Sequence, residues 1–180
     1  MAHVVGIPVT KGNGHVILPV KLEGDVSRYS EGQFVAFSKG TPQSSTPYVN
    51  ALAAETDNIC GVIMDINPCA KTASLVTSAH GVVVPAVDDK KRPTNGDPVK
   101  IDIATGFVST EGTLITNAQC TNHDVRGLNG KTGKEIPACL MLSFQGLRNI
   151  TPEVNPASPA PIPPTDEKKS TRQRTTPKLG

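Results

Sequence analysis

The feature that most constrains the fold is a series of short β-branched runs in residues 59–107, cut at near-regular intervals by glycine, proline and asparagine. Such runs are typical of strands in an all-β barrel or sandwich. Val99, Ile101 and Ile103 alternate with charged residues, which indicates one face on a core and one in water. Since no sustained 3.6-residue periodicity occurs elsewhere, we expect little helix. The sequence therefore predicts a compact all-β domain of the barrel or sandwich-like kind.

Three other runs set expectations for the rest of the domain. Residues 15–20 read as a strand, and Pro19 within it indicates an edge strand or a β-bulge, because proline donates no backbone hydrogen bond. Residues 112–129 are polar and irregular, so we expect a loop region there with one short strand at residues 113–116. Residues 136–144 form the most apolar run, which we expect to be the last strand.

Composition divides the chain into three parts. Residues 1–14 are expected to form an extended N-terminal arm that ends in a glycine-rich turn, and residues 15–150 carry the strand-like runs of the β domain. Residues 151–180 begin with six prolines within fourteen residues and end in a charged, threonine-rich stretch. Such a segment has too little apolar surface to fold alone and favours polyproline II. We therefore expect an extended, Pro-rich basic tail.

Charge and aromatic content exclude some functions. The net charge of +2 is too small to indicate a nucleic-acid-binding protein, and residues 151–180 hold that excess, with five basic residues against three acidic ones. Aromatic residues make up only 3% of the chain, and tryptophan is missing. Surfaces that bind single strands or carbohydrates usually need aromatic platforms. The sequence thus predicts no direct contact with nucleic acid.

The cysteines and the N-terminus indicate a cytoplasmic site of synthesis. Cys60, Cys69, Cys120 and Cys139 include no pair at the spacing of a CxxC motif. The N-terminus lacks the basic start and apolar run of a signal peptide, and no run of about 18 apolar residues predicts a membrane span. We therefore expect reduced, buried thiols in a protein made in a cytoplasm, with disulfides as the alternative.

Two local patterns resemble binding motifs but are incomplete. Residues 130–132 match the end of a phosphate-binding loop, yet Val125 stands where that loop needs a glycine, so a hairpin turn is the better interpretation. Cys120 and His123 have the spacing of half a metal site, which Cys139 could join. A structural zinc site needs a second close pair, which is missing, so we predict no metal site.

Enzymatic activity has no positive support in the sequence. Asp88 and Asp89 could be paired carboxylates, but they precede Lys90, Lys91 and Arg92 in one charged block, which we interpret as a solvated loop tip. No serine lies in a G-x-S-x-G elbow, and no histidine lies in a motif that would make it a base. We therefore predict no catalytic residues, no cofactor and no enzyme.

Several segments follow one another in a fixed order between residues 15 and 146. They are the G-x-x-V strand at 32–37, Gly-Val-Ile-Met-Asp at 61–65, a turn at 70–72, the Val-rich run at 81–86, Gly-Asp-Pro-Val-Lys-Ile-Asp at 96–102, Gly-Phe-Val-Ser at 106–109 and the closing strand at 138–144. This order resembles the capsid decoration, or cement, proteins of bacteriophages. The chain departs from that family in its long loop at 112–135 and in its tail.

The resemblance implies a function by adhesion. It implies a β-barrel-like homotrimer on the outside of the virion capsid, bound where subunits of the major capsid protein meet. Such a protein would be made in the host cytoplasm, would contain no membrane segment and would stabilise the shell by bridging its subunits. A ligand- or receptor-binding β-domain displayed on a virion, with the tail as a linker, is the alternative. A small enzyme, or a carrier barrel with a modified Lys90 or Lys91, would need a motif that the sequence lacks.

We expect the tail and the N-terminal arm to reach neighbouring capsid subunits. The tail offers three basic side chains for an acidic capsid surface and two apolar side chains as anchors. These residues are Arg172, Arg174, Lys178, Ile162 and Leu179. An arm that becomes ordered on binding adds contact area at an entropic cost.

Overall fold

The predicted all-β fold is confirmed by a computed structural model, which describes residues 2–7, 15–39 and 45–150. This part of the chain forms eleven strands and two single-turn 3-10 helices. They are β1 (Ala2–Val4), β2 (Val16–Leu22), η1 (Val26–Arg28), β3 (Phe34–Phe37), β4 (Tyr48–Ala51), β5 (Ile59–Asn67), β6 (Thr72–Pro85), η2 (Asp89–Lys91), β7 (Pro98–Ile101), β8 (Leu114–Asn122), β9 (Arg126–Leu128), β10 (Glu135–Ile136) and β11 (Cys139–Phe144).

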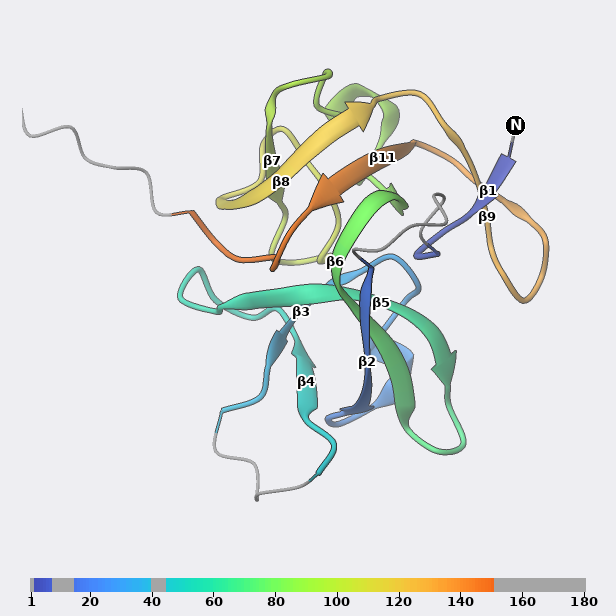
Figure 1. Ribbon diagram of the computed structural model, residues 1–180, viewed down its shortest axis with the longest axis vertical. Coiled ribbons are helices and arrows are strands. Elements are labelled where there is room, and N and C mark those ends of the chain that lie inside the picture. Colours follow the sequence, from blue (N-terminus) through green and yellow to red (C-terminus); the bar gives the residue numbers. More distant parts are fainter. Residues whose placement is uncertain (1, 8–14, 40–44, 151–180) are drawn as a thin grey trace, which may run out of the picture.

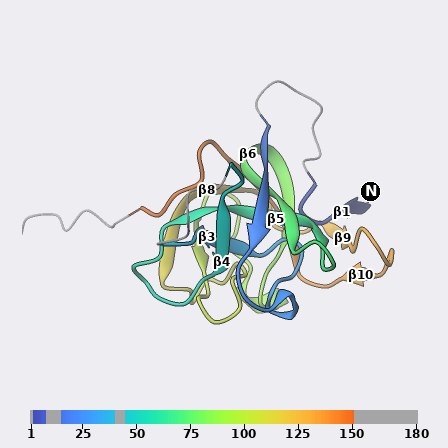
Figure 2. The ribbon, with the colours of Figure 1, turned by 90° about the horizontal axis from the view of Figure 1, so that it is seen from below.

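The strands form two layers that β6 joins (Figure 1). Eight strands follow one another in the order β2-β4-β3-β5-β6-β11-β8-β7. The first half of β6 pairs with β2 and β5, whereas residues 79–85 pair with β11. Strand β2 also meets β4 at Lys21 and Leu22, but no pairing among the described residues joins it to β7 at the other end of the order, so the arrangement is sandwich-like and the barrel is not closed. Figure 2 shows β1, β9 and β10 together at one side of the domain.

Strands β3, β5 and β6 form a shared wall between two hydrophobic cores. Along each of these strands, neighbouring side chains point to opposite faces. The face toward β7, β8 and β11 carries Phe34, Val62 and Val76, and the face toward β2 and β4 carries Val35, Ile63 and Leu75. All six side chains are fully buried, with exposed fractions of 0%. A strand buried on both faces reads as a continuous apolar run, which is why residues 59–63 show no polar alternation.

Gly61 is required by the close packing of this wall. A Cβ atom at this position would lie 2.6 Å from the Val76 carbonyl oxygen and 2.7 Å from Leu75 Cδ1. The carbonyl oxygen belongs to the backbone of the neighbouring strand and cannot rotate away. Any side chain here would therefore push β5 and β6 apart.

We expect Gly61→Ala to lower the free energy of unfolding by about 1–3 kcal/mol, the usual cost of overpacking a core. Urea denaturation followed by circular dichroism measures this loss. Gly24→Ala is the control, since its Cβ would meet nothing within 4 Å and would add only the strain of a φ of +79°. A Gly61→Ala protein as stable as the wild type would contradict the wall packing.

Gly81 lies just beyond the point where the pairing of β6 passes from β2 and β5 to β11. In the pairing of β11 with β6, Leu142 lies opposite Val82 and Ser143 lies opposite His80, so Gly81 is the extra residue of a β-bulge. Its φ of +78° suits glycine, and its N–H donates to Ser143 Oγ at 3.1 Å. The hydroxyl thus replaces the ladder hydrogen bond that the bulge interrupts.

Removing that hydroxyl with Ser143→Ala should lower the free energy of unfolding by about 1–3 kcal/mol, because a partly buried N–H loses its acceptor. Ser74→Ala, at a half-buried serine on the same β6, is the matched control. A change there within about 0.5 kcal/mol is expected. Equal stability losses in the two variants, measured by urea denaturation, would contradict a stabilising role of the Ser143 hydroxyl at the bulge.

The prediction of an extended N-terminal arm is wrong for residues 2–7, which pack against the domain. Strand β1 pairs in parallel with β9, and the Gly6 N–H donates to the Val83 carbonyl at 2.8 Å. Val5 is only 1% exposed and packs with Val83 and Cys139. The run was too short to indicate a strand, and its partner lies far away in the sequence. The remaining residues 8–14, and the predicted tail at 151–180, lie outside the described residues.

Candidate functional site

An exposed apolar strip on β2 is the feature of the described residues best suited to binding another macromolecule. Val16, Ile17 and Leu18 are 44%, 43% and 37% exposed, and Pro19 beside them is also exposed. Contiguous exposed apolar side chains are uncommon on soluble domains and mark interaction surfaces. We call residues 16–19 the β2 strip.

Pro19 limits how the β2 strip can bind. One edge of β2 pairs with β6, and among the described residues only Lys21 and Leu22 pair with a strand on its other edge. The Lys21 N–H points to that second edge, where it donates to the Pro47 carbonyl at 2.9 Å. Pro19, two residues earlier, faces the same edge and has no N–H to offer. The strip therefore suits side-chain contact better than the addition of a partner strand.

The sequence showed the strand but not its exposure. The strand predicted at residues 15–20 is confirmed as β2, and Pro19, predicted to mark an edge or a bulge, lies in the part of β2 that pairs only with β6 among the described residues. Apolar side chains are normally interpreted as core, so the composition of the strip gave no sign that it faces solvent. Four apolar residues in succession on a strand with an expected open edge were the only available signal.

The five predicted capsid-contact residues all lie in the tail. Ile162, Arg172, Arg174, Lys178 and Leu179 fall outside the described residues. Their contribution stays a prediction, and the geometry of the candidate site is that of the β2 strip.

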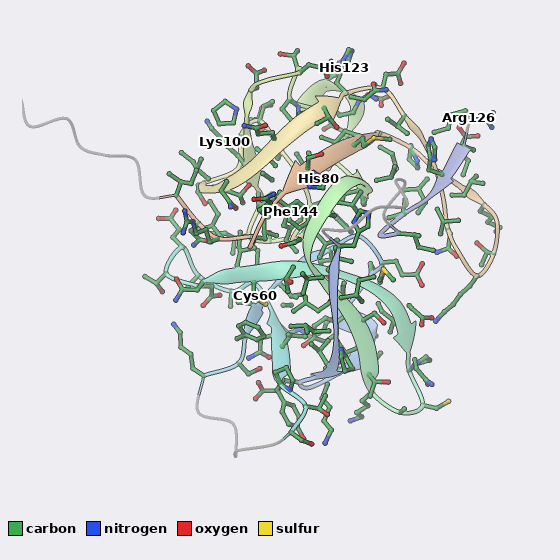
Figure 3. The ribbon with its side chains drawn as sticks, in the orientation of Figure 1. Cys60, His80, Lys100, His123, Arg126 and Phe144 are labelled. Atoms are coloured by element: carbon green, nitrogen blue, oxygen red, sulfur yellow. The ribbon has the colours of Figure 1, made fainter. Side chains whose placement is uncertain are left out.

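The incomplete metal motif is divided between a buried and an exposed region. Cys120 on β8 is buried, and its Sγ donates to the Pro93 carbonyl at 3.6 Å. His123 is exposed just beyond the end of β8 (Figure 3). Cys139 is buried beside Val5, and its Sγ donates to the Ile136 carbonyl at 3.4 Å. Within residues 2–7, 15–39 and 45–150, no three His, Cys, Asp or Glu side chains are placed to hold a metal ion together.

The charged block at residues 88–92 is more than the solvated loop tip that we expected. Asp88 Oδ1 accepts from the N–H groups of Lys90 and Lys91 and so begins η2. The Arg92 side chain is only 18% exposed and forms ion pairs with Asp89 at 3.3 Å and Asp124 at 3.2 Å. Its Nη1 also donates to backbone carbonyl groups in the β8–β9 connection and at the start of β11, at 2.6 and 3.2 Å. Arg92 therefore ties three segments together.

Arg92→Met keeps an unbranched apolar stem but removes the guanidinium and with it all of these interactions. We expect it to lower the free energy of unfolding by about 1–3 kcal/mol, because two backbone carbonyls lose a charged donor. Lys90→Met, at an exposed neighbour in the same block, should change stability by less than about 0.5 kcal/mol. Thermal denaturation of both variants measures the difference, and equal effects would contradict the bridging role.

One hollow on the described domain lies beside the β9–β10 turn. It measures about 550 Å³, lies open to solvent between the η1 region and the β9–β10 turn, and has Tyr29, Ile66 and Lys131 among its lining residues. Lys131 Nζ donates to the Ile66 carbonyl, which holds the turn against β5. Asn129 Oδ1 accepts from the Lys131 and Thr132 N–H groups, so residues 130–132 form the expected hairpin turn.

The four cysteines are free thiols with different environments. Cys60, Cys120 and Cys139 are buried, whereas Cys69 is exposed in the β5–β6 turn. Burial raises the pKa of the Cys60 thiol to about 12 and that of Cys139 to about 11. Since the thiolate is the reactive form, both buried thiols are protonated at neutral pH and unreactive.

A thiol reagent such as Ellman's reagent should modify one cysteine per native chain and all four after unfolding in guanidinium. Native modification should disappear in a Cys69→Ser variant. Rapid modification of a second thiol at pH 7–8 would contradict the burial of Cys60, Cys120 and Cys139.

Comparison with protein-family models finds no match for this chain, and comparison with curated proteins finds no relative. Among the described residues, no helix has the length and hydropathy of a membrane-spanning segment. The candidate site is therefore defined by its geometry alone, a β domain that presents the exposed β2 strip.

Proposed function

We propose that this chain is a non-enzymatic viral structural protein that binds the outer surface of an assembled bacteriophage capsid. It stabilises the shell by bridging subunits of the major capsid protein. The observation that carries the proposal is the β2 strip, whose four successive apolar side chains are all exposed. The resemblance to capsid decoration proteins supplies the identity of the partner.

The strip and the tail divide the binding between them. Apolar surface removed from water contributes roughly 25 cal/mol per Å², so the strip can provide affinity without any reacting group. The basic side chains of residues 151–180 add contacts to an acidic neighbour. A homotrimer would present three copies of each surface, and multivalency raises the avidity without new contacts.

The segments that carry the resemblance coincide with scaffold strands. Residues 32–37 contain β3, residues 61–65 lie in β5, and residues 81–86 contain the second half of β6. Residues 96–102 contain β7, and residues 138–144 contain β11. These elements build the shared wall and the core beside it. The resemblance therefore supports a common scaffold, while the surfaces that would select a particular capsid lie outside it.

Co-sedimentation with empty shells of a major capsid protein tests the proposal. The full chain should pellet with the shells and raise their melting temperature. A deletion of residues 151–180, and an Ile17→Ser/Leu18→Ser variant, should each bind at least tenfold more weakly while the domain stays folded. Val87→Ser, at another exposed apolar residue away from β2, is the control and should bind normally.

Two outcomes would contradict the proposal. The first is a folded chain that does not bind shells of any capsid protein. The second is equal occupancy for the full chain and both weakened variants. Binding to a cell-surface receptor or a soluble ligand, without affinity for shells, would instead favour a ligand- or receptor-binding domain with the tail as a linker.

A further inference from the structure

The N-terminal segment fills a socket that the rest of the domain builds. Val5 is 1% exposed, and it packs with Val83 on β6 and Cys139 on β11. A Cβ atom at Gly32 would lie 2.5 Å from Val5 Cγ1, and one at Gly127 would lie 2.9 Å from Val5 Cγ2. The two glycines thus leave the room that Val5 occupies. We call Gly32, Val83, Gly127 and Cys139 the β1 socket.

Strand β1 is held in the way that a peptide is held at the edge of a sheet. It pairs in parallel with β9, and the Val5 N–H donates to the Leu128 carbonyl at 2.9 Å. The Gly6 N–H then donates to the Val83 carbonyl at 2.8 Å. A Cβ at Gly6 would lie 2.8 Å from Met64 Cβ, so this position also requires glycine. Backbone hydrogen bonds with one side-chain pocket are the features of strand addition, and this socket fits a β-branched residue followed by glycine.

The two larger cores are formed without β1. In the described part of the chain, neither core contains a residue from the segment 2–7, and β1 lies outside the order of eight strands. Figure 2 shows β1 at one side of the domain, next to β9. Within residues 2–7, Val5 is the only buried hydrophobic side chain. Strand β1 can therefore leave its socket while both larger cores stay packed.

We infer that the β1 socket takes residues 2–7 of a second copy of this chain, so that copies exchange their N-terminal strands. The groups that hold β1 lie between residues 32 and 139, and a strand from another copy would make the same contacts. Exchange of an identical element between protomers is a low-cost route to oligomers. If each copy passes its strand to the next, a closed ring forms, and a ring of three would be the homotrimer proposed above.

Disulfide trapping between two full-length chains tests the exchange. In the register of β1 on β9, Ala2 lies opposite Arg126, and both residues are exposed. Neighbouring strands lie about 4.8 Å apart, within the Cα separation of about 4.4–6.8 Å that a disulfide spans. An Ala2→Cys chain and an Arg126→Cys chain, both with Cys69→Ser, are refolded together over a range of concentrations and then oxidised. We expect a heterodimer linked between positions 2 and 126, identified by mass spectrometry, with a yield that rises with concentration.

Three variants show whether the socket is responsible. Glu55→Cys, at an exposed site in the β4–β5 connection, replaces Arg126→Cys as the control and should give no heterodimer with the Ala2→Cys chain. Adding Val5→Asn to the Ala2→Cys chain should lower the yield at least tenfold, because the socket offers the amide no hydrogen-bond partner in place of water. Ile7→Asn is the matched variant on the same segment, since Ile7 is 46% exposed. It should keep the yield within about twofold.

A double Ala2→Cys/Arg126→Cys chain checks the register and should close an internal disulfide at low concentration. An internal disulfide in that chain, with no heterodimer in the mixture at any concentration, would show that each strand stays with its own chain and would overturn the inference. Absence of both disulfides, or an equal yield with Glu55→Cys, would overturn it as well. Loss of the internal disulfide only on capsid shells would assign the socket to a capsid segment and would also contradict it. Failure to bind shells, by contrast, leaves the exchange intact.

Discussion

The structure depends on the packing of both faces of the shared wall. Val62 and Ile63 are neighbours in β5, yet they enter different cores, and their partners on β6 are Val76 and Leu75. Few aromatic residues are available, so the wall relies on aliphatic side chains at full burial. Close approach of the strands at Gly61 is the condition for this arrangement. The Gly81 bulge lies within the part of β6 that pairs with β11, and the core beside β11 receives β6 side chains from both sides of it, Val76 and Ala79 before and Val82 and Val84 after.

This organisation leaves binding to the periphery. The interior of the described domain is filled by aliphatic packing, and its ionic cluster at Arg92 holds loops in place. What remains is surface: the β2 strip, with an edge blunted by Pro19, and the β1 socket at one side of the domain. A scaffold of this kind can act through contact area, provided that its partner is large and presents matching apolar surface.

The sequence predicted a strand and its buried face correctly where apolar and charged residues alternate. Val99 and Ile101 are fully buried and Lys100 is half-exposed, as their alternation predicted. It failed for β8, which runs from Leu114 to Asn122 where only a short strand was expected. Thr116 is buried there because its hydroxyl donates to the Val99 carbonyl. A buried threonine of this kind looks polar in the sequence, so its core position could not be predicted from hydrophobicity. Parallel pairing of β1 with β9, and the exposure of β2, depend on distant partners that no local pattern reveals.

The central claim is that this protein adheres to a shell through the β2 strip. Hydroxyl-radical footprinting of the chain, free and bound to empty capsid shells, tests it most directly by mass spectrometry of side-chain oxidation. The account predicts that Ile17 and Leu18 are oxidised readily in the free protein and protected on the shell, while exposed Val87 is oxidised equally in both states. Unchanged oxidation of the strip on a shell that has bound the protein would contradict it.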